Sequence, residues 1–261
     1  EVGIHIADVS YYLEAQSPLD KEAYKRSTSV YLVDKVVPML PEQLSNDLCS
    51  LNPNQNKLCF SVVLEISKKL EIIKSWIGRT VINSNYRFAY EEAQKIIQGQ
   101  THPFSKEINE LNNIAKLFRK KRIEMGAICF DKKEIRFKID KNKNPIEVYF
   151  KKPEDAHRLV EEFMLLANKT VAEFLGKKTK ENQKNKEGIY RVHDEPDLEK
   201  IQILKQFAKQ HNYHIDTGNK QTLSRSINAM LEQLKEKPEK NTIEKLTIRS
   251  MAKAKYTTKN I

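Results

Sequence analysis

The chain has 261 residues, of which 39% are hydrophobic and 31% charged, so it is long enough to bury a globular core. It carries 46 Lys and Arg against 35 Asp and Glu, a formal net charge of +11 that indicates a polyanionic partner such as nucleic acid. No stretch approaches the roughly 18 apolar residues of a membrane span. Three cysteines without Cys-x-x-Cys spacing suggest neither a disulfide framework nor a zinc site, so we expect reduced thiols, a cytoplasmic location and no membrane partner.

Taken in chain order, the first elements are strand-like. Alternating apolar and polar positions predict a strand over Val2–Val9, and a short helix is predicted over Leu19–Ser27. Two β-rich runs, Leu58–Ile66 and Ile72–Ile82, predict an antiparallel hairpin. A helix is then predicted over Phe88–Ile97, where Gly99 and Pro103 follow.

Between these elements lies an irregular stretch, Tyr31–Leu51, which contains two prolines, no glycine and no sustained period. Long ordered loops are uncommon unless they are functional, and the many apolar residues argue against disorder. We therefore predict a packed, irregular wall with Tyr31 at its entrance. The apolar residues expected to pack are Val33, Val36, Val37, Met39, Leu40, Leu44, Leu48 and Leu51.

The second half reads first as a hairpin and then mostly as helices. Runs at Glu134–Ile139 and Ile146–Lys151 predict a second hairpin, and the following helix, Asp155–Leu175, is apolar over most of its circumference and so is expected to be buried. The charge-rich run Lys177–Glu187 reads as an exposed loop. Further helices are expected at Leu198–Gln210, Gln221–Lys235 and Ile243–Lys255, which gives an α+β order without a domain boundary in the composition.

Few motifs carry chemistry by themselves. The chain has no phosphate-cradling glycine loop, and its adjacent acidic pairs read as solvated helix faces, except that Glu161 and Glu162 lie in an otherwise apolar helix. Isolated histidines such as His5 are more often hydrogen-bonded than catalytic. Tyr31 and Phe130 could stack on single-stranded nucleic acid, although core packing is the simpler interpretation from spacing alone.

Several blocks resemble the catalytic RNB domain of the ribonuclease II and ribonuclease R exoribonucleases. The similarity covers the whole chain in order, and the versions of the blocks present here are more similar to ribonuclease R. The blocks are Glu1-Val-Gly-Ile-His-Ile-Ala-Asp-Val-Ser10, Arg26-Ser-Thr-Ser-Val-Tyr31, Val37-Pro-Met-Leu-Pro41, Leu44-Ser-Asn-Asp-Leu-Cys-Ser-Leu51, Arg87-Phe-Ala-Tyr-Glu-Glu-Ala-Gln94, Val160-Glu-Glu-Phe-Met-Leu-Leu-Ala-Asn168, Tyr190-Arg-Val-His193 and Ser250-Met-Ala-Lys-Ala254.

The resemblance implies an α+β RNB-type domain with a mixed or antiparallel sheet, surrounding helices and an RNA channel. It also implies processive 3′→5′ hydrolysis of single-stranded RNA to nucleoside 5′-monophosphates, assisted by Mg²⁺. In this family the terminal bases stack between a tyrosine and a phenylalanine, which the matching blocks place at Tyr31 and Phe130. A glutamate near the terminal nucleotide corresponds to Glu162, with Glu161 as the alternative. We expect a monomer.

The match also lacks two parts of the family pattern. The family's metal-binding aspartate cluster would lie just before Val2, and its Ser-Pro-Ile-Arg-Arg block just after Ile261. We therefore expect residues 1–261 to be an internal part of an RNB domain, inactive alone, and assign no catalytic residue or metal ligand within them. Flanking cold-shock and S1 domains are expected in the longer protein. The alternatives are an RNB-like RNA-binding protein without catalysis and a basic scaffold without RNA affinity.

Overall fold

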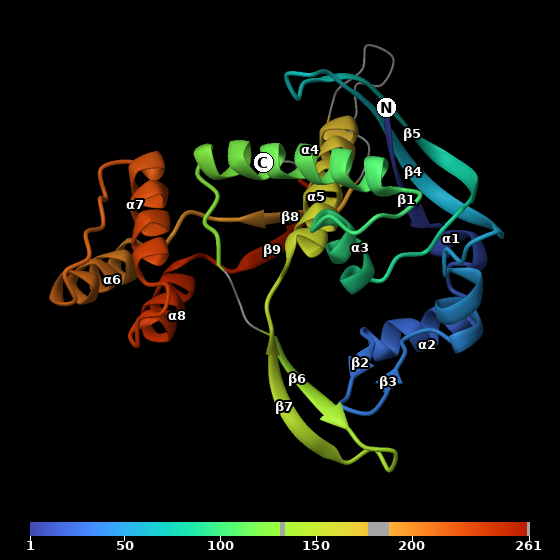
Figure 1. Ribbon diagram of the computed structural model, residues 1–261, viewed down its shortest axis with the longest axis horizontal. Coiled ribbons are helices and arrows are strands. Elements are labelled where there is room, and N and C mark those ends of the chain that lie inside the picture. The colour runs from blue at the N-terminus through green and yellow to red at the C-terminus, as the bar shows by residue number, and fades with distance from the viewer. Residues whose placement is uncertain (131–133, 177–187, 260–261) are drawn as a thin grey trace. The chain divides into compact units, whose positions relative to one another are not determined.

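The computed structural model describes residues 1–130, 134–176 and 188–259, and it combines helices with antiparallel strands (Figure 1). The expected α+β class is confirmed. The chain divides into two compact units, the first made of residues 1–115 and 132–171 and the second of residues 116–131 and 172–261. Two of these boundaries fall inside continuous helices, α4 (Ser105–Glu124) and α5 (Asp155–Gly176). For this reason the amino-acid composition shows no change that would mark a boundary between the units.

The main sheet of the first unit contains β1 (Val2–Ala7), β4 (Asn56–Ile66) and β5 (Ile72–Asn83) in the order β1-β4-β5. All neighbouring strands are antiparallel, which confirms the first predicted hairpin. In the turn between β4 and β5, the backbone N–H of Ser67 donates to the carbonyl of Glu71 at 2.9 Å. The β-branched and aromatic residues of these runs favour such a pleated sheet.

The two faces of this sheet differ. On one face, Val62 and Leu64 of β4 are buried against Ala167 of α5. Farther along the same face, Phe60 lies opposite Ile6, and both remain exposed. The other face carries a row of polar side chains, described below.

Short elements follow β1 in the first unit. After α1 (Val9–Tyr12), α2 (Pro18–Arg26) begins at a Ser17 hydroxyl that accepts a hydrogen bond from the backbone N–H of Asp20 at 3.2 Å. Such a cap satisfies one of the unpaired N–H groups at a helix start. The chain then forms two two-residue strands, β2 (Val30–Tyr31) and β3 (Val36–Val37). A π-helical turn, η1, follows at Gln43–Leu48.

Helix α3 (Tyr90–Ile97) is tied to the start of α5 by a buried side chain. The Oε1 atom of Gln94 accepts a hydrogen bond from the backbone N–H of Ala156 at 3.0 Å. The expectation that α5 is buried around most of its circumference was wrong: Met164 is 54% exposed and Leu165 is 40% exposed. Within the described ranges, no helix is both long and apolar enough to cross a membrane.

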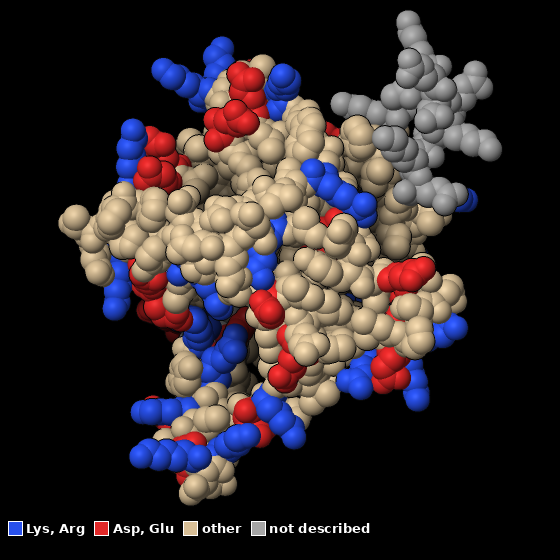
Figure 2. Space-filling view, turned by 90° about the vertical axis from the view of Figure 1, so that its right-hand side faces the viewer, with Lys and Arg blue, Asp and Glu red and all other residues tan. Residues whose placement is uncertain are grey.

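The second predicted hairpin is also confirmed, as β6 (Glu134–Ile139) and β7 (Pro145–Lys151). Asp140 holds its turn, because its carboxylate accepts hydrogen bonds from the backbone N–H groups of Asn142 and Asn144 at 2.8 and 2.9 Å. The bonds from Asn144 and Asn142 also lower the pKa of Asp140. Lys and Arg side chains gather on the lower lobe of the molecule in Figure 2, at the level of this hairpin in Figure 1.

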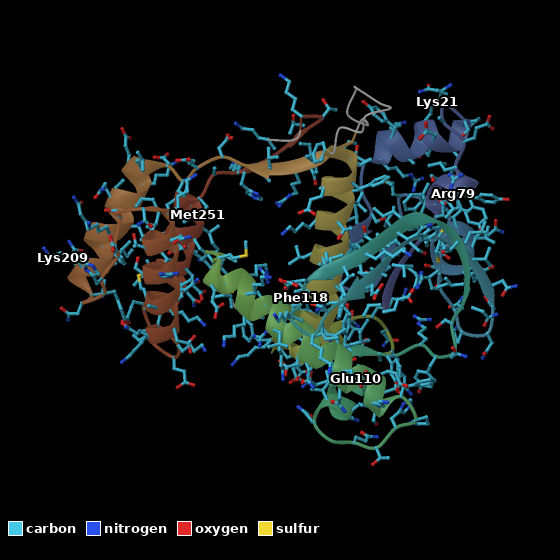
Figure 3. The ribbon with its side chains drawn as sticks, turned by 90° about the horizontal axis from the view of Figure 1, so that it is seen from above. Lys21, Arg79, Glu110, Phe118, Lys209 and Met251 are labelled. Carbon is cyan, nitrogen blue, oxygen red and sulfur yellow. The ribbon has the colours of Figure 1, made fainter. Side chains whose placement is uncertain are left out.

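The second unit has a helical core made by α6 (Leu198–Gln210), α7 (Lys220–Gln233) and α8 (Lys240–Ser250). Each helix contributes an apolar stripe, and Met251, labelled in Figure 3, packs against the resulting core. The buried core residues are Ile201, Leu204, Ala208, Ile215, Ile227, Met230, Leu231, Leu234 and Ile243.

A two-stranded sheet in the second unit was not predicted. Strands β8 (Tyr190–His193) and β9 (Ala254–Thr257) pair antiparallel. The helix expected to continue to Lys255 therefore stops at Ser250, whose carbonyl accepts a hydrogen bond from the backbone N–H of Asp197 at 3.0 Å. A distant segment thus sets the end of this helix. The predicted loop at 177–187 lies outside the described residues.

Candidate functional site

Tyr31 is presented by a small hairpin. It pairs with Val36, and the backbone N–H of Leu32 donates to the carbonyl of Lys35 at 2.8 Å, which closes the connection between β2 and β3. The Tyr31 side chain is 78% exposed. A tyrosine ring held on a short strand and open to solvent is available to stack on a base.

The packed wall predicted around Tyr31 was wrong in part. Leu44 is buried, but Val33, Val36 and Val37 are between 41% and 50% exposed. The reason is that β2 and β3 pair over only two residues each and form a sheet of their own, so the main sheet offers them no layer to pack against. This stretch is therefore an exposed apolar surface in the chain as it stands.

The two glutamates of α5 occupy different environments. Glu162 is 3% exposed and lies on the buried side of the helix next to Phe163, whereas Glu161 is exposed. A carboxylate that loses water requires polar partners to offset its desolvation. As the side chains stand, Glu161 is the more accessible to a nucleotide. The sequence could not distinguish the two, because both are Glu and they are adjacent.

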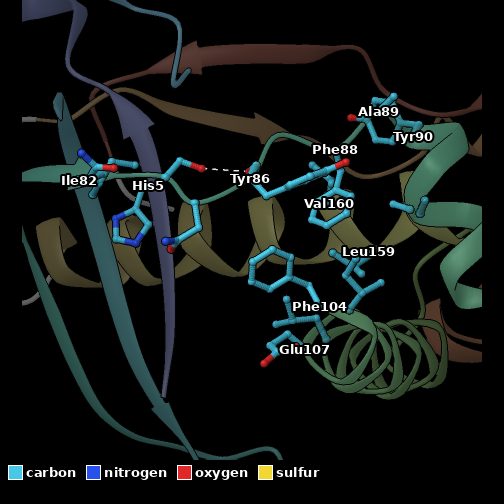
Figure 4. A pocket seen from close by; sticks show the side chains of 17 residues that line it. His5, Ile82, Tyr86, Phe88, Ala89, Tyr90, Phe104, Glu107, Leu159 and Val160 are labelled. Atoms are coloured by element: carbon cyan, nitrogen blue, oxygen red, sulfur yellow. Dashed lines mark hydrogen bonds between the residues drawn. The ribbon is translucent and has the colours of Figure 1, made fainter. Parts of the chain in front are cut away.

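A cavity of about 690 Å³ opens beside the same helix, entirely within the first unit (Figure 4). Its wall includes Leu159 and Val160, one helical turn or less before Glu161 and Glu162. Aromatic rings also line the cavity: Tyr86 and Phe88 have their ring centroids 4.4 Å apart, and the ring centroid of Phe104 lies 6.0 Å from that of Tyr86. The cavity is concave and mostly apolar with a few polar groups, as ligand sites usually are.

One hydrogen bond and one ring stack hold aromatic residues that line the cavity. The Tyr86 hydroxyl donates to Glu92 at 2.5 Å, and this hydrogen bond raises the pKa of Tyr86. Tyr90 stacks on the ring of His157, with centroids 4.2 Å apart and the planes 10° from parallel. The resemblance to the RNB domain includes the Arg87–Gln94 block but implies no role for these aromatic residues. The density of aromatic residues between 86 and 104 was the signal that could have found them.

A polar row crosses the sheet at one edge of the cavity. The Nδ1 atom of His5 lies 2.7 Å from the hydroxyl of Ser61, which in turn lies 2.5 Å from the hydroxyl of Thr80. Burial lowers the pKa of His5. The imidazole is therefore neutral at pH 7, and its hydrogen bond to Ser61 holds it in place. This arrangement fits the sequence-based interpretation of His5 as a hydrogen-bonded histidine.

Phe130 lies in the second unit, where it is half-buried and packs against the helical core. Asn228 fixes the segment that leads to it: the amide donates to the carbonyl of Ala127 at 2.8 Å and accepts from the backbone N–H of Cys129 at 3.1 Å. Gly126 enters this segment with a φ of +108°. These contacts give Phe130 a packing role. Its pairing with Tyr31 around a base stack stays a prediction.

The described residues contain no cluster of metal-ligating side chains. In the ranges that the structure covers, no group of three His, Cys, Asp or Glu side chains could hold a metal ion. Four carboxylates of the adjacent acidic pairs Glu91-Glu92, Glu154-Asp155 and Asp194-Glu195 form ion pairs instead: Glu91 with Lys151, Asp155 with Arg158, Asp194 with Lys255 and Glu195 with Lys220. The hydrogen bond from Lys151 lowers the pKa of Glu91. The described residues thus do not fit a Mg²⁺ site, and we derive no step through one.

Comparison with known proteins gives consistent matches. The family model described as the RNB domain matches residues 1–261. The chain is 36% identical over 269 residues to "Ribonuclease R 1" of Lactococcus lactis, covering 100% of this chain and 32% of that protein. The structure of Mycoplasma genitalium RNase R in complex with ribose-methylated single-stranded RNA has a TM-score of 0.86 and 30% sequence identity, and the match covers 99% of this chain and 40% of that one.

A catalytically divergent relative shares the fold. The yeast protein Ssd1, described as a pseudonuclease, matches with a TM-score of 0.74 at 22% identity, covering 98% of this chain and 30% of that one. That likeness concerns the fold alone. The chain spans about a third of the length of the curated relatives it matches: 32% of one and 36% of another.

Proposed function

The chain belongs to the RNB domain family, and on that basis we propose that it is part of a 3′→5′ exoribonuclease that hydrolyses RNA processively to nucleoside 5′-monophosphates. The observation that carries the proposal is the match of all 261 residues to this family. The likeness in fold to a ribonuclease R solved with single-stranded RNA supports the same substrate. We propose that the longer protein acts as a monomer in the cytoplasm.

The site residues have distinct proposed roles. Tyr31 and Phe130 stack on the bases at the 3′ end of the strand, and Glu162 accepts a hydrogen bond from the terminal ribose. Two features support these roles: the open ring of Tyr31, and the position of Glu162 on α5 within three residues of Leu159 and Val160, which line the cavity. Glu161 is the alternative for the ribose contact, because its side chain is exposed.

The proposed activity includes Mg²⁺ as the cofactor of the longer protein. Because the described residues do not form a site for it, its ligands would come from other parts of that protein. When bound, Mg²⁺ would supply an activated water and charge neutralisation at the phosphate. The residues of this chain then contribute binding and positioning of the strand.

The experiment that tests the proposal uses the longer protein and a single-stranded RNA labelled at its 5′ end. We expect progressive shortening from the 3′ end, release of 5′-mononucleotides and loss of activity when EDTA removes the metal. Internal cleavage products would contradict the exonucleolytic assignment. Tight RNA binding without any hydrolysis would instead establish the non-catalytic RNA-binding alternative.

The ribose contact predicts a difference between RNA and DNA. Glu162→Gln in the longer protein should slow turnover of RNA more than that of matched DNA, because only RNA offers the 2′-hydroxyl. Glu161→Gln is the matched control on the adjacent, exposed position. Single-turnover rates on both substrates measure the effect. Selective slowing by Glu161→Gln alone would move the role to that residue, and equal slowing on both substrates would indicate a structural role.

The net charge predicts the salt dependence of binding. Because residues 1–261 carry +11 at pH 7, the affinity of the longer protein for single-stranded RNA should fall steeply as the salt concentration rises, since counterions released into more concentrated salt gain less entropy. A plot of log K against log salt concentration should have a slope of about −0.7 for each phosphate contacted. Fluorescence anisotropy at several salt concentrations measures this slope. A flat plot would reject the charge argument and favour the scaffold alternative.

A further inference from the structure

The hairpin β6–β7 has one apolar face that is open to solvent. In its register, Ile135 lies opposite Phe150, and Phe137 lies opposite Val148. Directly opposed residues share a face of an antiparallel pair, so these four side chains point to the same side. Their exposed fractions are 59%, 63%, 42% and 55% in that order. We call these four residues the apolar face of the hairpin.

The opposite face of the hairpin is polar and internally paired. It carries an ion pair between Arg136 and Glu134 at 2.7 Å and another between Lys138 and Glu147 at 3.7 Å. Tyr149 lies opposite Arg136 on this side. Charges that are already paired leave little reason for this face to be the contact surface. The apolar face is the side that has apolar area still to bury.

Contacts at both ends of the hairpin help to order it. Isolated two-stranded hairpins are only marginally stable, but this one is tied at both ends. Lys151 pairs with Glu91 of α3 at 2.5 Å, and Lys143 at the tip pairs with Asp34, between β2 and β3, at 3.9 Å. The turn is further held by Asp140. A surface that is ordered beforehand loses little conformational entropy when it binds.

The contact at the tip brings the hairpin β6–β7 close to the segment that carries Tyr31. Asp34 lies three residues after Tyr31, on the connection between β2 and β3. Figure 1 shows the tip of β6–β7 next to this small hairpin, in agreement with the pair between Lys143 and Asp34. A strand whose end lies at Tyr31 would thus have the hairpin within reach.

The area and the charge favour RNA over a protein partner. Two paired strands of six residues present a face of roughly 200 Å², given about 3.4 Å per residue and 4.8 Å between strands. A specific protein interface buries about 800 Å² on each partner. Residues 134–152 also contain six Lys or Arg and three Asp or Glu, a local excess of positive charge. Four of these cations are ion-paired, so the charge argument rests on the net excess of the hairpin, whereas aromatic rings on a sheet face are how several RNA-binding modules stack bases.

We propose that Phe137 and Phe150 form a second stacking surface for single-stranded RNA, which holds bases upstream of those at Tyr31. This inference rests on the proposed function, since it assumes RNA as the ligand. The two rings occupy diagonal positions of one face, and Ile135 and Val148 flank them. Each ring packs on one base, and the net positive charge of the hairpin favours a strand with negative phosphates.

The test compares three variants of the full 261-residue chain by anisotropy with a labelled 12-nucleotide RNA. The double variant Phe137→Ala/Phe150→Ala should bind at least about tenfold more weakly, as loss of base stacking predicts. Tyr149→Ala is the matched control, because it removes an exposed ring from the opposite face of the same hairpin, and it should bind as the unmodified chain does. Phe137→Tyr/Phe150→Tyr keeps both rings and should restore binding.

A second measurement does not depend on the stability of the variants. Ultraviolet crosslinking of RNA containing 4-thiouridine to the unmodified chain should label the peptide that carries Phe137 or Phe150. If the unmodified chain binds RNA but the double alanine variant binds equally well, or the crosslinks miss this peptide, the inference is wrong while the proposed function stands. If the unmodified chain binds no RNA at any salt concentration, the inference is wrong as well, whereas the proposed function is decided separately by shortening of RNA with the longer protein. Self-association that the double alanine variant abolishes would assign the face to a second copy and overturn the inference.

Discussion

The two units of the molecule bury different kinds of side chain. Every charged residue that is buried in the described part of the chain, Asp8, Lys57 and Glu162, belongs to the first unit. The buried polar residues described in the second unit are Ser224, Thr247 and Ser250, whose hydroxyls each donate to a carbonyl of their own helix.

For buried apolar residues the order is reversed, because the second unit has the larger cluster. The second unit collects nine buried residues in one core, whereas the main cluster of the first unit has three. Across β2–β3 and β6–β7 the first unit instead leaves neighbouring apolar side chains exposed. Burying charges and exposing apolar groups both cost stability, so such features are usually retained for function. Most residues proposed to contact RNA thus lie in the first unit, whereas the second unit contributes its helical core and Phe130.

The largest effect should come from the core of the second unit. Leu204 is 1% exposed, so Leu204→Ala should lower the free energy of unfolding by about 2–5 kcal/mol through lost burial and a cavity. Val36→Ala in the first unit, where Val36 is 47% exposed, should change it by less than about 0.5 kcal/mol. Urea denaturation of both variants measures the difference. Equal costs would remove the contrast between the two units.

The two aromatic residues proposed to hold the RNA end should behave differently. Phe130→Ala should cost about 2–3 kcal/mol of stability, less than the 3–5 kcal/mol of a fully buried phenylalanine, because Phe130 is half-buried against the core. Tyr31→Ala should leave the melting temperature nearly unchanged, since its ring is 78% exposed. Both variants should weaken binding of the RNA 3′ end by roughly ten- to a hundredfold if both rings stack.

Measuring melting temperature and oligonucleotide affinity on the same two variants separates stacking from packing. If Phe130→Ala lowers stability while the folded fraction binds RNA with unchanged affinity, Phe130 is a core residue and the clamp has only one aromatic side. If Tyr31→Ala leaves the affinity unchanged, the exposed hairpin of β2 and β3 has another role. Either result would sharpen the division of roles between the units.

The smallest effect concerns pH and the polar row of the first unit. Burial lowers the pKa of His5 below its ordinary value of 6.5, so protons bind the unfolded chain more tightly than the folded one. The stabilising contribution of neutral His5 is therefore complete above pH 6.5 and is lost as the pH falls through the lower folded pKa. His5→Gln should make the unfolding free energy fall less between about pH 7 and pH 5. Identical pH profiles for the two proteins would contradict this assignment.

Much of the local structure could be predicted from the sequence. The hairpins β4–β5 and β6–β7 follow from alternating β-rich runs around turn residues, and most helices follow from apolar stripes at helical spacing. Both signals depend on neighbours within a few residues. The α+β class follows from the order of these strands and helices. The RNB family follows from the matching sequence blocks, because they are several residues long and occur in order along the whole chain.

The sequence by itself thus determined most of the elements, their order and the family, because these depend on short-range pattern. Only the tertiary structure decided that Glu162 is buried and Glu161 exposed, and that β9 forms where a helix was expected. It also decided that the stretch after Tyr31 lies open. The physical reason is common to all three: burial and strand pairing depend on partners supplied by distant segments, such as β8 for β9, and local pattern does not specify which partners arrive.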